Sequence, residues 1–345
     1  MIRKYFFIFS ITKISGFCHY IIFLPFFITV LACNDIETRL PFNKSCPVIF
    51  DNDDPRDTYT EEYLMALASA GSIKLKGIIT SSSYGTYNRW VTEEDYENFV
   101  ALRADIYNRA FQSGFKNIPI PVRGVKGNLV RPSSGKVEDT EPAFSEGGML
   151  IRDEARKATP AKPLVVIAGG ALSAVADAYL MDPGISDRVV VMFLNASADS
   201  IEDGYNGWVD GWATVITFQK MNVIRYRSVG HDTKDYDPAV PKTRILSDLP
   251  DTPLRVVMFE KKHPTNPLPN ERDADCPPAI HFMRPDYAKD MHRQSYSHSA
   301  IVDGHIVPVL KDDPHGNILF FTSMSKEIAT EEWWRALTNR DAWLK

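Results

Sequence analysis

Short apolar runs alternate with helical patterns along most of this chain, and that alternation is the strongest constraint on its fold. The run at 163–168 is apolar throughout, as is typical of strands buried on both faces of a parallel sheet. Further strands are expected at 47–51, 74–80, 118–122 and 188–193, and helices at 61–70, 92–111, 147–157 and 171–181. The order strand, helix, strand predicts a single α/β domain at 46–345, with a mostly parallel, open sheet covered by helices on both faces.

One long stretch does not follow this alternation. Residues 229–291 are rich in Pro, Asp and His and show little periodicity, apart from a strand-like run at 254–259. Long irregular segments in compact domains usually carry function. We therefore expect this stretch to supply loops around a functional site.

The composition limits the classes of partner. The 345 residues are 44% hydrophobic and 24% charged, as in globular proteins. The net charge is -5 and the body of the chain has no basic run, so there is no electrostatic footprint for a nucleic acid. A small-molecule substrate is the expected partner, and the sequence leaves open whether the chain forms a homo-oligomer.

The first 33 residues have the outline of an export signal. Arg3, Lys4 and Lys13 precede an apolar stretch at 21–32. The stretch ends in Val-Leu-Ala-Cys, similar to a bacterial lipobox, and cleavage before Cys33 would leave a lipid-anchored terminus. We expect an exported protein, periplasmic or at the cell surface, with a tether at 34–45. A membrane-spanning anchor is the alternative, although 21–32 is short for a span.

Two cysteines remain in the body of the chain, Cys46 and Cys276. Two thiols do not form a disulfide scaffold. They could pair in an oxidising compartment or remain as free buried thiols, and the sequence leaves both arrangements open.

The first expected strand ends in a group of carboxylates. Asp51, Asp53, Asp54 and Asp57 lie within seven residues, directly after apolar positions 48–50. The carboxyl ends of strands in open α/β sheets face the ligand crevice. Crowded carboxylates need a compensating cation, and Ca²⁺ or Mg²⁺ binds compact sets of oxygens. The plain alternative is a solvated acidic turn.

Three segments, in the right order, carry a resemblance to a known family. They are 51–57 (DNDDPRD), 164–173 (LVVIAGGALS), and the pair 182–183 (DP) with 188–192 (RVVVM). Together they resemble the inosine-uridine preferring nucleoside hydrolase family, over about residues 47–221. The resemblance implies a nucleoside hydrolase-like fold and hydrolysis of the N-glycosidic bond of ribonucleosides, with Ca²⁺ at the bottom of the cleft.

The resemblance also implies roles for residues of this chain. Metal ligands would be Asp51, Asp53, Asp57 and the main-chain carbonyl of Gly169. Asp53 would in addition be the general base that takes a proton from the attacking water. A metal ion suits this chemistry because it orients water and lowers its pKa.

Further roles fall on scattered residues. Those implied to contact the substrate are Asp57, Asn195, Asn206, Tyr84 and Asn88. The family's C-terminal His-Asp pair can be aligned with His298 and Ser299, which would make His298 the acid that protonates the leaving base. Asp303 would then replace the missing metal ligand, one helical turn after Ser299.

The chain departs from the family pattern at the closing Asp-Asp pair, where it has Asp57 and Thr58; the other register pairs Arg56 with Asp57. Two alternatives to a nucleoside hydrolase therefore stay open. The first is a non-catalytic surface protein of the same fold that binds a sugar or nucleoside. The second is an Asp-x-Asp phosphohydrolase, although Asp54 and Pro55 do not fit the continuation of that motif.

Overall fold

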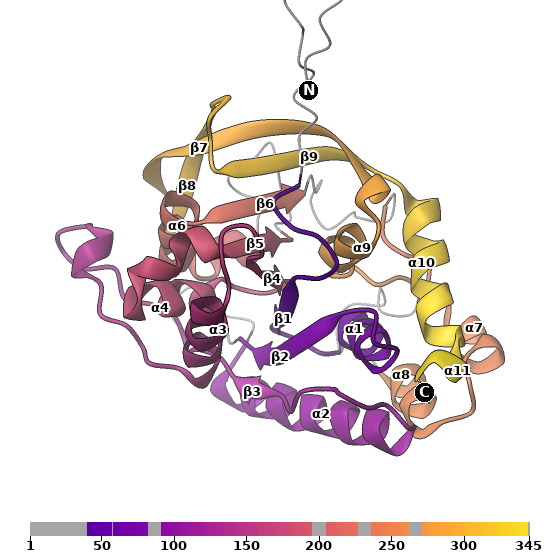
Figure 1. Ribbon diagram of the computed structural model, residues 1–345. Helices are drawn as coiled ribbons and strands as arrows, with labels where there is room; N and C mark the ends of the chain where they lie inside the picture. Colours follow the sequence, from indigo (N-terminus) through magenta and orange to yellow (C-terminus); the bar gives the residue numbers. More distant parts are fainter. Residues whose placement is uncertain are drawn as a thin grey trace, which may run out of the picture. The chain divides into compact units, whose positions relative to one another are not determined.

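The computed structural model describes residues 40–56, 58–81, 91–194, 205–226, 236–261 and 271–343, which belong to one compact unit at 40–345. A nine-stranded sheet with the order β3-β2-β1-β4-β5-β6-β9-β7-β8 runs through the described part of this unit (Figure 1). Its strands are β1 (Pro47–Asn52), β2 (Lys74–Thr80), β3 (Val122–Arg123), β4 (Leu164–Ala168), β5 (Val189–Phe193), β6 (Asn222–Tyr226), β7 (Ala288–Val302), β8 (His305–Asp312) and β9 (Ile318–Met324).

The sheet is mostly parallel, as the alternation of strands and helices predicts. From β3 to β9 in the sheet order, each strand runs parallel to its neighbour. Only β7 breaks the pattern, since it pairs antiparallel with both β9 and β8. The carboxyl ends of β1, β4, β5 and β6 therefore lie along one edge of the sheet, where ligands bind in open α/β folds.

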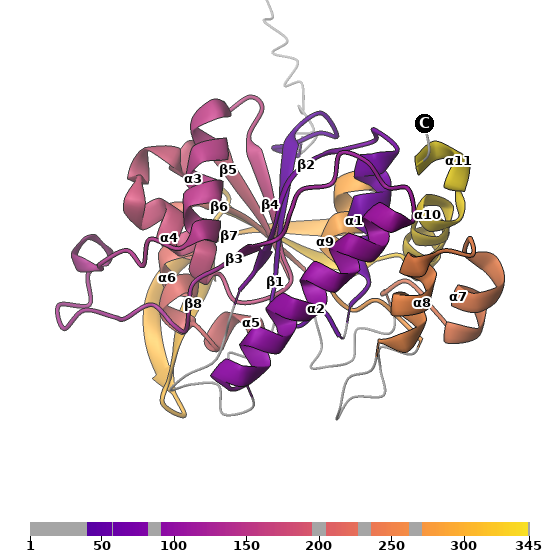
Figure 2. The same ribbon diagram turned by 90° about the horizontal axis from the view of Figure 1, so that it is seen from below.

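Helices cover both faces of the sheet (Figure 2). One face carries α3, α4 and α6, and the other carries α1, α2, α9 and α10. The helices of the described residues are α1 (Thr60–Ser69), α2 (Glu93–Gln112), α3 (Glu146–Lys157), α4 (Ser173–Met181), α5 (Tyr205–Trp208), α6 (Gly211–Lys220), α7 (Lys242–Asp248), α8 (Pro253–Glu260), α9 (Pro277–Met283), α10 (Lys326–Thr338) and α11 (Arg340–Trp343), with 3₁₀ turns at η1 (Val137–Asp139), η2 (Pro183–Arg188) and η4 (Pro285–Tyr287).

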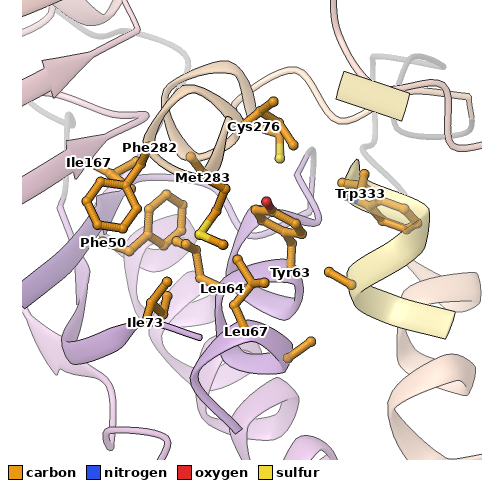
Figure 3. Close-up of a cluster of buried hydrophobic side chains, with 14 of the residues drawn as sticks. Phe50, Tyr63, Leu64, Leu67, Ile73, Ile167, Cys276, Phe282, Met283 and Trp333 are labelled. Carbon is orange, nitrogen blue, oxygen red and sulfur yellow. The ribbon is translucent and has the colours of Figure 1, made fainter. Parts of the chain in front are cut away.

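A hydrophobic core lies on each face of the sheet. Each buried strand contributes side chains to both cores, because successive side chains point to opposite faces. In β1, Val48 and Phe50 belong to the core under α1, while Ile49 belongs to the core under α3 and α4. Figure 3 shows the first core, in which Leu64 and Leu67 of α1 lie among side chains of β1, β4, α9 and α10. This burial on both faces explains why the strand sequences are apolar throughout.

Two expected strands differ from the structure. The run at 254–259 was expected as a strand, but it lies in α8, because Thr252 caps the helix by accepting a hydrogen bond from the Arg255 amide and Pro253 suits its first turn. The strand expected at 118–122 is also wrong in its position, since β3 is only Val122–Arg123. The stretch 229–291 is likewise less irregular than expected, since it contains α7, α8 and α9.

The C-terminal expectation of a helical relation between positions 299 and 303 is wrong. Residues 288–302 form the long strand β7, and Asp303 lies in the turn to β8 with a φ of 49°. In an extended strand, residues four apart are separated by more than 12 Å, at roughly 3.3 Å per residue. Asp303 therefore does not lie one helical turn from Ser299.

Three further sequence expectations can be compared with the described residues. Cys46 and Cys276 are both buried and free, so they do not form a disulfide. No helix within the described ranges is long and apolar enough to cross a membrane. The export signal, the lipid anchor at Cys33 and the first half of the tether, 34–39, fall outside the described residues.

Candidate functional site

The carboxyl end of β1 presents its acidic side chains to the edge of the sheet. Asp51 is fully buried, and the Ser81 hydroxyl donates a hydrogen bond to its Oδ1. Its Oδ2 has no hydrogen-bond partner among the described residues. Asp53 is partly exposed, and its Oδ1 accepts from the Asp54 amide at 2.7 Å. Residues 53–56 and 58, which we call the acidic turn, directly follow the buried end of β1.

A third carboxylate reaches this edge from a distant part of the chain. Asp275 lies just before α9 and is 9% exposed. Its Oδ2 accepts a hydrogen bond from Asn52 Nδ2 at 3.1 Å. A Cβ atom placed on Gly169 would lie 3.1 Å from the Asp275 Cγ, so the carboxyl packs directly against the turn after β4. The ends of β1 and β4 thus pack against the loop before α9.

The two glycines after β4 make this close approach possible. A Cβ on Gly170 would lie 2.7 Å from the Asp53 amide nitrogen, closer than real Cβ atoms come to backbone. The Gly169 carbonyl accepts a hydrogen bond from Asn206 Nδ2 at 2.7 Å, and the same nitrogen donates to the Leu194 carbonyl at 3.1 Å. Asn206 of α5 therefore joins the ends of β4 and β5.

The carboxyls of this edge hold protons more tightly than usual. Burial raises the pKa of Asp51 to about 7, although the hydrogen bond from Ser81 and the Arg103 charge oppose the shift. Burial also raises the pKa of Asp53 to about 6, and the Asp54 charge adds to it. The pKa of Asp275 lies well above its usual range because of burial first and the Asp53 charge second. The edge is therefore only partly ionised at neutral pH unless a cation is present.

We expect the stability of the cation-free protein to fall as pH rises from 5.5 to 8. The Asp51 pKa of about 7 is higher than that of an unfolded aspartate, so the folded state binds the proton more tightly. That contribution to stability is present at low pH and is lost as the pH rises through about 7. Urea unfolding with EDTA at the two pH values should show a shallower fall for Asp51→Asn. Equal falls in the wild type and the variant would contradict this assignment.

Thr58 is committed to a structural role. Its hydroxyl donates to Asp273 Oδ1 at 2.8 Å, and Thr60 Oγ1 donates to the same oxygen at 2.9 Å. The Tyr59 amide also donates to Oδ1, and Trp333 Nε1 of α10 donates to Oδ2. Thr58 thus anchors the end of the acidic turn to the loop before α9.

The structure places the sequence-predicted residues in two groups. Asp51, Asp53, Gly169 and Asn206 are brought together at the carboxyl edge. His298 is exposed on β7 and Asp303 is exposed in the hairpin turn. The hairpin does reach α5, since the His305 and Trp208 ring centroids are 4.3 Å apart. The other predicted residues, Asp57, Tyr84, Asn88 and Asn195, lie outside the described residues.

Sequence reasoning missed Asp273 and Asp275. The signal was the pattern Asp-Ala-Asp at 273–275 followed by Pro277 and Pro278, which repeats the Asp-x-Asp spacing of β1 and then starts a helix. This pattern lies in the stretch 229–291, whose sequence shows little periodicity. Within the described ranges, no group of three or more His, Cys, Asp or Glu side chains is arranged to hold a metal ion.

Comparisons with known proteins reveal similarity in structure but not in sequence. No protein-family model and no curated protein matches the chain. A plant nucleoside hydrolase, PpNRh1, is 13% identical with a TM-score of 0.57, covering 85% of this chain and 99% of its own. The purine-preferring ribonucleoside hydrolase from Gardnerella vaginalis is 14% identical with a TM-score of 0.55, covering 87% and 100%.

A third similar structure is not described as a hydrolase. The type III effector protein XopQ, complexed with adenosine diphosphate ribose, is 9% identical with a TM-score of 0.54, covering 86% of this chain and 94% of its own. At such identities the likeness concerns the fold alone. The described unit is a single α/β domain with a nucleoside hydrolase-like fold.

Proposed function

We propose that this protein hydrolyses the N-glycosidic bond of a ribonucleoside or a related N-riboside, with Asp53 as the general base. The observation that carries the proposal is the approach of Asp275 to the end of β1, where it packs against Gly169 and Asn52 and is repelled by Asp53. Paired carboxylates at the carboxyl edge of a parallel sheet are suited to acid-base chemistry on a bound ligand.

The proposed reaction is a hydrolysis that yields ribose and the free base. Water attacks C1′ of the ribose while the bond from C1′ to the base nitrogen breaks, and the bonding electrons leave with the base. Asp53 accepts a proton from the water, and a proton is delivered to the departing base. The sugar becomes positively charged in the transition state, and a carboxylate that is ionised at this edge favours that charge. The identity of His298 as the proton donor stays a prediction.

The donor set at this edge fits a hard cation. Asp53 and Asp275 offer carboxylate oxygens and Gly169 offers a carbonyl oxygen, which are the ligand types that Ca²⁺ binds. Burial raises the pKa values of Asp51, Asp53 and Asp275, so a bound cation would favour their charged forms. When bound, such an ion would orient the water and lower its pKa. We expect weak affinity, since Thr58 replaces a carboxylate.

A non-catalytic protein of the same fold that binds a sugar or nucleoside is the second candidate. The observation that favours it is the engagement of Thr58 with Asp273, which turns a position expected to hold metal or sugar into an internal support. The fold and the carboxyl edge would then serve recognition of ribose hydroxyls rather than bond cleavage.

An assay of ribose release separates the candidates. We expect the purified protein to release ribose from at least one of inosine, uridine, adenosine and guanosine, with faster release in Ca²⁺ than in EDTA. Saturable binding of a nucleoside or of ADP-ribose without ribose release would favour the second candidate. If the protein neither binds nor cleaves any of them, both candidates fail. Release of phosphate from phenyl phosphate would instead support an Asp-x-Asp phosphohydrolase.

A further inference from the structure

Two buried cations lie beneath the acidic turn, outside the group of carboxyls already described. Arg103 of α2 is 1% exposed, and Lys261, the residue after α8, is 3% exposed. Arg103 Nε lies 2.7 Å from Glu61 Oε2, and Lys261 Nζ lies 3.6 Å from Glu61 Oε1. Lys261 Nζ also contacts Glu62 Oε1 at 2.5 Å. The first turn of α1 therefore joins two cations that are 158 positions apart in the sequence.

Each cation also reaches the backbone of the acidic turn. Arg103 Nη1 donates to the carbonyls of Asn52 and Asp53, at 3.2 and 3.4 Å. Lys261 Nζ donates to the carbonyl of Thr58 at 2.8 Å. The start of the turn is thus held by one cation and its end by the other. Because Glu61 contacts both cations, movement at either end of the turn disturbs the same ionic network.

The buried ionic network of Arg103, Lys261, Glu61 and Glu62 contributes little net stability to the fold. Taking two cations and two carboxylates out of water carries a large desolvation cost, and apolar residues of similar size often do as well. All four groups are nevertheless buried, and Lys261 also lies 5.3 Å from the centre of the Tyr59 ring. A role in fixing geometry accounts for this arrangement better than a role in stability.

We propose that Lys261 and Arg103, linked through Glu61, are positioning residues that set the acidic turn and thereby the Asp53 carboxylate. This inference rests on the proposed function, because it gives the turn a substrate to act on. The inference also assigns a role to α7 and α8, which lie in the stretch 229–291. Lys242 of α7 donates to the Phe259 and Lys261 carbonyls, at 2.7 and 2.6 Å, so α7 and the end of α8 hold the backbone from which Lys261 extends.

The test removes Lys261 together with its closest partner. Removing one charge alone would leave the other buried and unpaired, which is strongly destabilising. The double variant Lys261→Met, Glu62→Gln removes both charges of the pair, so neither is left buried alone. Its matched control is Lys157→Met, Glu154→Gln, an ion pair on α3 whose lysine is 68% exposed. The readouts are amide hydrogen exchange along the chain and the steady-state constants for the N-riboside that the wild type cleaves best.

We expect exchange at residues 53–60 to become about tenfold faster in the double variant, while β4 at 164–168 stays unchanged. The relevant amides of Asp53, Asp54 and Tyr59 donate to side chains, so their exchange reports the position of the turn. We expect kcat to fall about tenfold and KM to change less than threefold, because positioning acts on the reacting geometry. The single variant Lys261→Arg should retain most of the wild-type protection and rate.

Three results would overturn the proposal. They are unchanged exchange in the turn, faster exchange in β4 as well as in the turn, and a local change in exchange with an unchanged kcat. If the double variant does not fold, Arg103→Met, Glu61→Gln removes the other buried pair without leaving one charge alone, and the same outcomes apply. A wild-type protein that releases no ribose would contradict the proposed function, whereas the exchange experiment would still decide whether the network positions the turn.

Discussion

Asp53→Asn is expected to reduce kcat for ribose release by about 10²- to 10⁴-fold, the range that a general base contributes. The amide is nearly the same size as the carboxyl and keeps an oxygen for the Asp54 amide, which donates to Asp53 Oδ1 at 2.7 Å. It cannot take a proton from water. The effect should therefore appear in kcat, with the folded structure preserved.

Its control is Asp187→Asn, at an exposed aspartate near the start of β5. That change removes the same charge from the molecule without touching the carboxyl edge, and we expect kcat to stay within twofold of the wild type. Circular dichroism and the urea midpoint of each variant would confirm that both are folded. A rate for Asp53→Asn within threefold of the wild type would remove Asp53 from the role of base.

Asp273→Ala is expected to destabilise the protein by about 3–5 kcal/mol, because it removes the acceptor of several buried donors. Four donors from the acidic turn, the start of α1 and α10 converge on this carboxylate. After the substitution, Trp333 Nε1 and the Thr60 hydroxyl would lose their acceptor, at about 1–3 kcal/mol for each such group, whereas the Thr58 hydroxyl can still donate to Thr60 Oγ1. The loss of the buried Asp273 charge offsets part of that sum.

Urea unfolding at one fixed pH measures the loss of unfolding free energy. Two further variants should show smaller losses. Asp273→Asn keeps an acceptor oxygen and should cost less than the alanine change. Trp333→Phe removes one of the four donors and the second ring of the indole, and should also cost less. An unfolding free energy for Asp273→Ala within about 1 kcal/mol of the wild type would show that the donors find other partners.

The sequence predicted the parallel half of the sheet well, because its strands are buried on both faces. Runs such as 164–168 and 189–193 are apolar at every position, and turn glycines or helical spacing mark their ends. The acidic residues at the end of β1 could be placed at the ligand edge for the same reason. A strand position fixes the edge of the sheet at which its last side chains emerge.

The rest of the site depends on contacts that no local pattern reveals. Asn52 and Asp275 are 223 positions apart, and the short helix that follows Asp275 has too few turns to show a period. The error in the helical relation between Ser299 and Asp303 has a different cause. Most positions of β7 after Ala288 are partly or fully exposed, so its sequence lacks the alternation of a half-buried strand. Pairing with β8 and β9, rather than its own sequence pattern, makes this segment extended.

The outermost strands of the sheet, β3 and β8, determine how easily another chain can pair with its edges. Unpaired strand edges are templates for aggregation, which proteins commonly prevent with short strands, prolines and lysines. Here one outermost strand, β3, has only two residues. The other, β8, has Pro308, which lacks an N–H, in its middle and an exposed Lys311 near its end. Among the described strands, neither outermost one therefore offers a long, regular backbone for another chain to extend.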